Sequence, residues 1–288
     1  MNGNLKVAIQ KKGRLTEKSI ELLKLCGFDF ESYTERLFLT ARNYQIDILF
    51  LRDDDIPEYV KDKVADVGIV GENIVFEKQT QNVVLEKLGF GRCSLLLAHP
   101  ENKQLKSLDE INGKTIATTY PKILNDFLKK NNLKANIIEL SGSVEIAPSL
   151  GVADLICDIV STGNTLMMNK LKKSFKVFDS EAVLISSREK LDDDKKNDIL
   201  KDLLRRIRSV LDARNSKYLM MNIPKDKLKT ITDIIPSLKS PTVLPLADEN
   251  LLAVHAVIPS DQFWNIIENL KKAGASGIIL LPIENMII

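Results

Sequence analysis

The chain has 288 residues and a mass of 32.3 kDa, more than one hydrophobic core usually organises, so two or three domains are expected. Its 41 Lys and Arg residues nearly balance 39 Asp and Glu residues, which gives a formal charge of +2. This balance gives no whole-chain signal for nucleic acid or an anionic membrane, and neither is expected as a partner. Three dispersed cysteines and two histidines disfavour a disulfide framework and a zinc enzyme.

The N-terminal residues and the apolar runs indicate where the protein is found. Residues 1–10 contain no basic segment followed by a long apolar stretch, so no signal peptide is expected. The longest apolar runs, such as 277–281 and 94–98, fall far short of the ~20 residues that span a bilayer. We therefore expect a cytoplasmic, reducing location.

Strand and helix patterns alternate through the first 98 residues. Helical spacing of apolar residues predicts helices at 15–26 and 53–63. Short apolar runs predict strands at 5–10, 46–51, 67–70, 83–88 and 94–98. This alternation predicts an α/β fold with a mostly parallel sheet and helices on both faces.

The same alternation continues in residues 99–181. The predicted strands are 115–118, 135–140, 155–160 and 175–178, and the predicted helices are 107–111, 123–131, 144–150 and 165–172. Residues 182–186 could return as a strand to the first lobe, and a long charged helix follows at 192–214. We therefore predict a first lobe of residues 1–98 with 182–214, and a second lobe of residues 99–181.

The pattern changes in the last part of the chain. The predicted order there is strand, helix, two strands, helix, strand, at 218–223, 225–235, 242–246, 251–258, 261–272 and 277–283. This βαββαβ order is typical of ferredoxin-like folds. We predict that residues 215–288 form an accessory domain.

A strand-to-helix turn gives the strongest local signal of a binding site. The apolar strand 155–160 is followed by a short run of small, hydroxyl and amide residues, Ser161, Thr162, Gly163, Asn164 and Thr165. Exposed backbone N–H groups at the start of a helix, together with hydroxyl groups, suit a phosphate. An ordinary N-capped helix would need only one Ser or Thr, so phosphate binding is favoured slightly over a cap.

Two acidic residues are expected near this turn. Asp158 lies at the end of the strand, at the sheet edge where ligands bind in open α/β sheets. Its carboxylate could accept hydrogen bonds from a sugar diol or hold Mg²⁺ through water, and a helix cap explains it equally well. Glu145 opens another helix, where an acid is favourable in any case.

The first strand-to-helix turn is basic. Lys11, Lys12, Gly13 and Arg14 place three cations where a helix prefers acids, which indicates a bound polyanion or, equally, a solvated loop. Arg52 follows the next strand and precedes three acids at 53–55, which are best explained as helix-start residues.

Two further strand ends carry candidate nucleotide contacts. Gly71 ends the strand 67–70 in a segment with two glycines, which lacks the spacing of a dinucleotide fingerprint. Tyr120 follows the strand 115–118 and could stack on a base or close a loop.

Taken together, these segments resemble a known family. The resemblance is carried in order, and essentially end to end, by residues 7–15, 47–57, 65–73, 116–121, 141–148, 153–166 and 240–246. They resemble the ATP phosphoribosyltransferase family in its long form, which has a C-terminal regulatory domain. Seven ordered segments are much more specific than any one of them.

The resemblance implies a fold and an activity. The fold would be a two-lobed α/β core similar to a periplasmic binding protein, with the active site between the lobes, and a ferredoxin-like domain that binds histidine. The reaction would transfer ribose 5-phosphate from phosphoribosyl pyrophosphate (PRPP) to N1 of the adenine of ATP, release pyrophosphate and require Mg²⁺. This is the first step of histidine biosynthesis, with histidine as inhibitor, in homo-oligomers that shift between dimers and hexamers.

The resemblance also implies roles for individual residues. Catalysis would use Asp158, Glu145 and Arg14, and Asp158 would hold the metal through the ligand or water. The 5-phosphate would contact Ser161, Thr162, Gly163, Asn164 and Thr165. ATP would contact Lys11, Lys12, Gly13, Arg14, Arg52, Gly71 and Tyr120. Histidine would bind near Asn222, Thr242 and Ser276.

Two other classes of protein remain as alternatives. A solute-binding protein shares the two-lobed core, but a missing signal sequence and the appended domain disfavour it. An inactive regulatory subunit would need a damaged phosphate turn, and residues 161–165 are intact.

Overall fold

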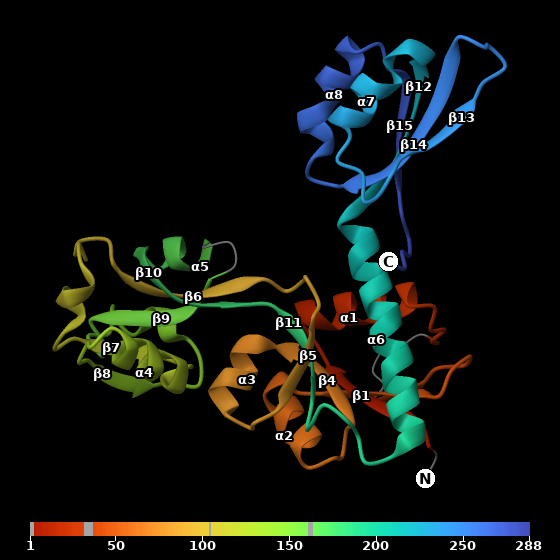
Figure 1. The fold of residues 1–288 in the computed structure, drawn as a ribbon. Helices are drawn as coiled ribbons and strands as arrows, with labels where there is room; N and C mark the ends of the chain where they lie inside the picture. Colours follow the sequence, from red (N-terminus) through yellow and green to blue (C-terminus); the bar gives the residue numbers. More distant parts are fainter. Residues whose placement is uncertain (1–2, 32–36, 104, 161–163) are drawn as a thin grey trace. The chain divides into compact units, whose positions relative to one another are not determined.

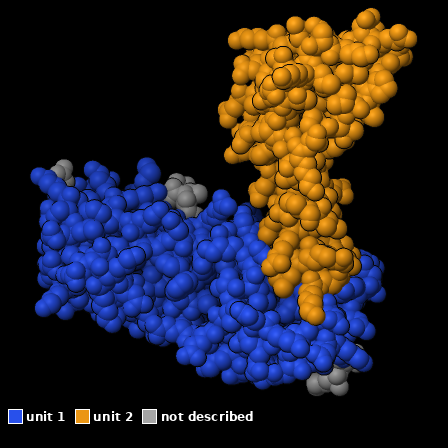
Figure 2. Space-filling view, viewed as in Figure 1, with its two compact units in different colours: residues 1–21, 29–200 blue, residues 22–28, 201–288 orange. Residues whose placement is uncertain are grey.

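The computed structural model describes residues 3–31, 37–103, 105–160 and 164–288, apart from the side chains of residues 164 and 165. It divides into two compact units, Met1–Glu21 with Asp29–Leu200 and Leu22–Phe28 with Lys201–Ile288 (Figure 2). Helices α1 (Arg14–Leu25) and α6 (Asp194–Arg214) each continue from one unit into the other. Within the described residues, no helix is both long and apolar enough to cross a membrane.

The first lobe is built on a mixed sheet (Figure 1). Its strands, in sheet order, are β2 (Phe38–Thr40), β3 (Ile46–Leu51), β1 (Leu5–Gln10), β4 (Val67–Gly71), β11 (Ala182–Ser186) and β5 (Val83–Lys87). Strand β1 is parallel to β3 and β4, whereas β2 and β11 pair antiparallel with their neighbours. The expected mostly parallel sheet is therefore wrong, because β11 returns from the second lobe in the opposite direction.

The central strands of this sheet are buried on both faces. Every residue of β4 and of β11 is buried, as expected for runs rich in Val and Ile that are covered on both sides. Helices follow four strands of this sheet: α1 follows β1, α2 (Ile56–Lys61) follows β3 after a 3₁₀ turn at Asp53–Asp55, α3 (Glu72–Lys78) follows β4, and α6 follows β11. Ligands can reach such a sheet at its strand ends more easily than at its faces.

The second lobe has its own mixed sheet. Its strands, in sheet order, are β10 (Leu171–Ser180), β6 (Cys93–Pro100), β9 (Leu155–Val160), β7 (Thr115–Thr118) and β8 (Asn136–Glu139). Its helical segments are a 3₁₀ turn at Leu108–Ile111, α4 (Pro121–Lys130), a 3₁₀ turn at Val144–Ile146 and α5 (Asn164–Met168). The helices expected at 144–150 and 165–172 are shorter than predicted. The first is only a 3₁₀ turn, and the second ends at Met168, before β10 begins at Leu171.

One predicted lobe boundary needs correction. Strand β6 pairs with β9 and β10 of the second sheet, so residues 93–98, expected in the first lobe, belong to the sheet of the second. The sequence could not indicate this, because the apolar pattern of a strand does not show which sheet the strand joins. The division of the chain into three domains stays a prediction.

The C-terminal domain has the predicted order of elements. Its elements are β12 (Ser216–Pro224), a 3₁₀ turn at Lys225–Lys227, α7 (Leu228–Ile234), β13 (Thr242–Pro245), β14 (Leu251–Pro259), α8 (Phe263–Lys272) and β15 (Ser276–Pro282). The sheet order is β13-β14-β12-β15, and residues such as Leu219, Val254, Ile231 and Leu270 form a buried core between sheet and helices. The expected α/β fold class with a βαββαβ domain is confirmed.

Candidate functional site

In the first lobe, the predicted nucleotide contacts lie at one edge of the sheet. Strands β1, β3 and β4 are parallel neighbours, so the segments after Gln10 and Leu51 leave the same edge as Gly71. The backbone N–H of Lys11 donates to the Leu51 carbonyl at 2.7 Å, which ties the basic turn to the end of β3. Residues 11–14 and 52 therefore follow strands that end at a common edge.

The basic turn is exposed and has a defined backbone. Lys11, Lys12, Gly13 and Arg14 are all exposed, and Gly13 has φ +132°, a region that favours glycine. The Thr16 hydroxyl donates to the Gln10 carbonyl at 2.8 Å and fixes the first turn of α1. Exposed cations beside the positive end of a helix dipole give this turn the electrostatics of an anion site.

Arg52 and Gly71 occupy the next two strand ends. Arg52 is exposed, and the three acids that follow it form a 3₁₀ turn. Burial, and then the charges of Asp54 and Asp55, raise the pKa of Asp53. A Cβ atom at Gly71 would lie 2.4 Å from Oδ1 of Asn73, so only glycine leaves room for that side chain.

In the second lobe, two predicted catalytic carboxylates influence each other. Asp158 is half-buried in β9, and its Oδ1 accepts a hydrogen bond from the Ile159 N–H at 2.7 Å. Burial raises the pKa of Asp158, the Ile159 hydrogen bond opposes the rise, and the negative charge of Glu145 adds to it. The structure therefore brings Asp158 and Glu145 close enough for their charges to interact.

Tyr120 lies where the two lobes meet. Its ring packs against the hydrophobic clusters of both lobes. The pKa of Tyr120 is raised chiefly by burial and further by the charges of Asp158 and Asp54, while hydrogen bonds with Thr119 and Asn73 lower it. A residue predicted to contact ATP is thus placed beside Asp158 of its own lobe and Asp54 of the other.

A hydroxyl group that the sequence analysis did not single out orients Tyr120. The fully buried Thr118 donates from Oγ1 to the Cys157 carbonyl at 2.7 Å, and the same oxygen accepts the Tyr120 N–H at 2.9 Å. The signal for this role was present in the sequence as a threonine at the end of an apolar strand. Its partners in β9 could be named only from the structure.

The predicted phosphate turn is only partly visible. Ser161, Thr162 and Gly163 lie outside the described residues, and so do the side chains of Asn164 and Thr165. Strand β9 ends at Val160 and α5 begins at Asn164, so the strand and the helix flank the turn as predicted.

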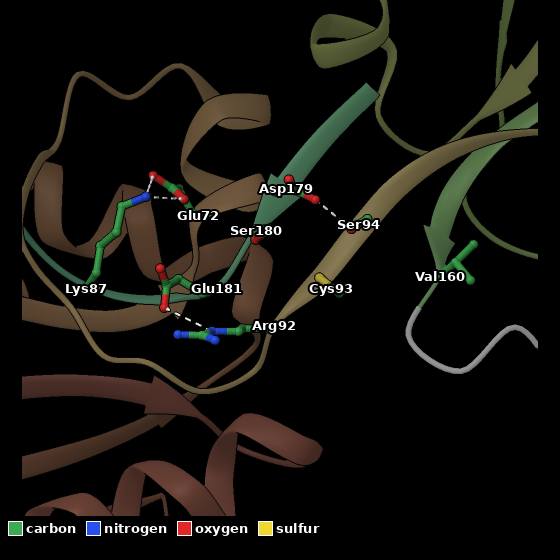
Figure 3. A pocket seen from close by; sticks show the side chains of 9 residues that line it. All are labelled: Glu72, Lys87, Arg92, Cys93, Ser94, Val160, Asp179, Ser180 and Glu181. Atoms are coloured by element: carbon green, nitrogen blue, oxygen red, sulfur yellow. Dashed lines mark hydrogen bonds and ion pairs between the residues drawn. The ribbon is translucent and has the colours of Figure 1, made fainter. Parts of the chain in front are cut away.

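A pocket of about 450 Å³ lies beside Val160, at the end of β9 (Figure 3). It is lined by Glu72, Lys87, Arg92, Cys93, Ser94, Val160, Asp179, Ser180 and Glu181. Nζ of Lys87 lies 3.1 Å from a Glu72 carboxylate oxygen, and Nε of Arg92 lies 3.9 Å from one of Glu181. Figure 3 shows both pairs on one side of the pocket and Val160, the last residue before the predicted phosphate turn, on the other. The cations that line the pocket are thus balanced by its own carboxylates.

The predicted histidine contacts are brought together only in part. Asn222 of β12 is the register partner of Ser276 in β15, and the Ser276 hydroxyl lies 3.5 Å from the Asn222 carbonyl oxygen. Thr242 lies in β13, at the other edge of the sheet, with β14 between it and β12. With strands about 4.8 Å apart, Thr242 is roughly 10 Å from the Asn222 strand.

The described residues hold no group of three or more His, Cys, Asp or Glu side chains suited to a metal ion. The Asp158 and Glu145 pair nevertheless fits Mg²⁺, which usually takes one or two protein carboxylates and completes its shell with water and substrate phosphates. The negative charge of Glu145, which adds to the rise in the pKa of Asp158 caused by burial, would be compensated by such a cation.

Comparisons with known proteins agree with this geometry. A family model described as ATP phosphoribosyltransferase matches residues 52–209, and one described as HisG, C-terminal domain, matches residues 213–285. An ATP phosphoribosyltransferase of Cytophaga hutchinsonii is 48% identical over 287 residues, covering 100% of both chains. One of Bacteroides thetaiotaomicron is 46% identical over 284 residues, covering 99% of this chain and 100% of its own.

A solved structure extends the comparison to the fold. A chain of the ATP phosphoribosyl transferase (HisG:HisZ) complex from Thermotoga maritima matches with a TM-score of 0.59 and 30% identity. The match covers 71% of this chain and 98% of that one. The matched family models and the relatives of full length show that the chain belongs to the ATP phosphoribosyltransferase family.

Proposed function

We propose that this pentosyltransferase of histidine biosynthesis transfers the 5-phosphoribosyl group of PRPP to N1 of the adenine of ATP and that histidine inhibits the reaction. The bond between C1 of the ribose and the pyrophosphate oxygen breaks, and its electron pair leaves with pyrophosphate. The lone pair of N1 forms the new bond to C1. The observation that carries the proposal is that Asp158 interacts electrostatically with Glu145 and with Tyr120 in a chain of this family.

The carboxylates of the second lobe act on the ribose. Positive charge develops at C1 as the leaving group departs, and a fixed negative charge lowers the energy of that transition state. Asp158 and Glu145 supply this charge and accept hydrogen bonds from the ribose hydroxyls. The half-buried setting of Asp158 strengthens its interaction with C1, because less water screens it.

The cations of the first lobe act on the polyphosphates. Lys11, Lys12, Arg14 and Arg52 are exposed at one sheet edge, and their charges offset the repulsion between ATP and PRPP. Gly13 and Gly71 allow close approach of the backbone, and Tyr120 stacks on the adenine ring. Since N1 is already a fair nucleophile, positioning contributes more to the rate than proton transfer.

The turn after β9 holds the 5-phosphate of PRPP. The proposal places the phosphate on Ser161, Thr162, Gly163, Asn164 and Thr165, and it is supported by the flanking strand and helix. Asp158, with Glu145 near it, would hold Mg²⁺ through the ligand or through water. When bound, this ion neutralises charge on the departing pyrophosphate.

The C-terminal domain carries regulation in this proposal. Histidine binds near Asn222 and Ser276, with Thr242 as a more distant contact on the same sheet. A homo-oligomer in equilibrium between dimer and hexamer and a cytoplasmic location are further parts of the proposal.

Release of pyrophosphate from ATP plus PRPP, measured with Mg²⁺ and with or without histidine, tests the function. We expect release that requires both substrates and falls when histidine is added. Histidine binding without turnover would support a regulatory subunit instead. Binding of a small solute with neither turnover nor histidine binding would support a solute-binding protein.

A further inference from the structure

Helix α3 of the first lobe reaches the second lobe through three of its side chains. Asn73 Oδ1 accepts a hydrogen bond from the Ser180 hydroxyl at 2.8 Å, and the Phe76 ring packs edge-on against Phe178 at a centroid distance of 4.9 Å. The third side chain, Glu77, accepts two backbone hydrogen bonds from the start of α4. Through these contacts, α3 links the first lobe to the second.

The Glu77 contacts have the geometry of a helix cap supplied from another helix. Oε1 accepts the N–H of Lys122 at 3.0 Å, and Oε2 accepts the N–H of Ile123 at 3.1 Å. Both donors lie in the first turn of α4, whose own N-cap, Tyr120, makes no side-chain cap hydrogen bond. Normally a Ser, Thr, Asp or Asn at the N-cap would accept these hydrogen bonds. A carboxylate is also favoured there by the positive end of the helix dipole.

The position of this helix start determines the position of Tyr120. Tyr120 directly precedes Pro121, the first residue of α4, and its carbonyl accepts the Leu124 N–H at 3.1 Å. Its backbone is therefore part of the turn that Glu77 holds. Glu77 itself faces the second lobe, since both of its carboxylate oxygens accept hydrogen bonds from α4.

From these contacts we infer that Glu77 is a positioning residue for ATP. By holding the start of α4 against α3, it keeps the Tyr120 ring between the lobes, where the adenine would stack. The inference rests on the proposed function, in which Tyr120 contacts the nucleotide and the turn after β9 holds PRPP. Because the 5-phosphate and the ribose of PRPP are held within the second lobe, PRPP affinity depends less on these contacts of α3 than ATP affinity does.

The first test measures the dissociation constants of ATP and of PRPP by calorimetry for the full chain with Mg²⁺. For Glu77→Ala we expect about tenfold weaker ATP binding, equivalent to about 1.4 kcal/mol, with PRPP affinity within about twofold of wild type. Glu77→Gln keeps the side-chain shape but loses the charge and one acceptor, so we expect an intermediate loss of about threefold. Lys78→Ala, an exposed neighbour on α3, serves as the matched control.

A double-mutant cycle with Tyr120→Ala separates positioning from general stability. If Glu77 acts through Tyr120, Glu77→Ala weakens ATP binding less than twofold in the Tyr120→Ala background. The same tenfold loss in both backgrounds, an equal loss of PRPP affinity, or an equal effect of Lys78→Ala would overturn the inference. If circular dichroism shows that Glu77→Ala does not fold, Glu77→Gln replaces it in the cycle.

The proposed function would be contradicted by a result different from those that would overturn the inference about Glu77. Wild-type protein that binds ATP and PRPP without releasing pyrophosphate would contradict the reaction and leave the inference about ATP binding standing. Wild-type protein that does not bind ATP would contradict both.

Discussion

The first-lobe sheet and the C-terminal sheet contain similar apolar strands, but they present different surfaces. Every residue of β4 and β11 is buried, whereas every residue of β13 is exposed and every residue of β15 is exposed or half-exposed. The central strands of the first sheet are covered on both faces, so their polar groups gather at the strand ends. The C-terminal sheet, with helices packed on its core face, leaves its other face and its turns accessible. This difference suggests that chemistry depends on strand ends and regulation on the open sheet, so the two should be separable by mutation.

The largest effect is expected for Asp158→Asn. Loss of the negative charge near C1 should lower kcat for pyrophosphate release about 100- to 1000-fold, as for other preorganised electrostatic groups. The free energy of unfolding at neutral pH should not fall. Burial raises the pKa of Asp158 in the folded state, so its ionised form destabilises the fold above that pKa, and this cost fades as pH falls.

Urea denaturation and histidine calorimetry on the same variant complete this test. We expect histidine binding to be preserved, since Asn222 and Ser276 belong to the other sheet. Full activity of Asp158→Asn, or loss of histidine binding with it, would break the separation between the two regions.

A smaller effect is expected for Arg14→Ala in the basic turn. Removing one cation from the phosphate contacts should raise KM for ATP about tenfold, because a hydrogen bond to a charged group contributes about 1.5–3 kcal/mol before screening. Steady-state kinetics with each substrate varied in turn measure this change. Lys18→Ala, exposed on the same helix, is the control. Unchanged kinetics with both substrates would remove Arg14 from the site.

The C-terminal sheet is tested by Asn222→Ala. The variant should need about tenfold more histidine for half-inhibition, when the inhibited rate is normalised to its own rate without histidine. The reason is loss of the contacts that we propose between the Asn222 side chain and histidine, next to Ser276 in the neighbouring strand. Lys229→Ala, on the helix that covers the core face, is the control. An unchanged response to histidine would place the regulatory site elsewhere.

The smallest effect on rate, and the most specific one, is expected for Glu145→Gln. The negative charge of Glu145 contributes to the raised pKa of Asp158, so its removal should lower that pKa. If Asp158 acts in its ionised form, the acid limb of the profile of kcat/KM against pH should move to lower pH. The plateau of the profile should be severalfold lower. A limb that stays in place would show that another group controls it.

Much of the fold could be predicted because apolar runs bounded by turn residues are local signals. Strands β3, β7, β9 and β11 agree with the sequence prediction residue for residue. Helix α3 was missed because its seven residues hold one short apolar run, Ile74 to Phe76, which is too short to show helical spacing. Strand β2 was missed because three residues carry too little periodicity.

The site was predictable only as a set of strand ends. The sequence placed Asp158 at the end of a strand and Glu145 and Tyr120 after strands, and the structure brings Asp158 within electrostatic reach of both. It could not indicate that Asp54 and Asn73 approach Tyr120 from the other lobe, or that Glu77 caps α4. Such contacts join residues more than 40 positions apart and depend on how the two sheets are placed.

The central claim is that the turn after β9 holds the phosphate of PRPP with the ribose beside Asp158. A crystal structure of the protein soaked with PRPP and Mg²⁺ tests it most directly. The account predicts density for the 5-phosphate on residues 161–165 and a ribose hydroxyl within hydrogen-bond distance of the Asp158 carboxylate. An empty turn, with PRPP bound at another part of the chain, would contradict it.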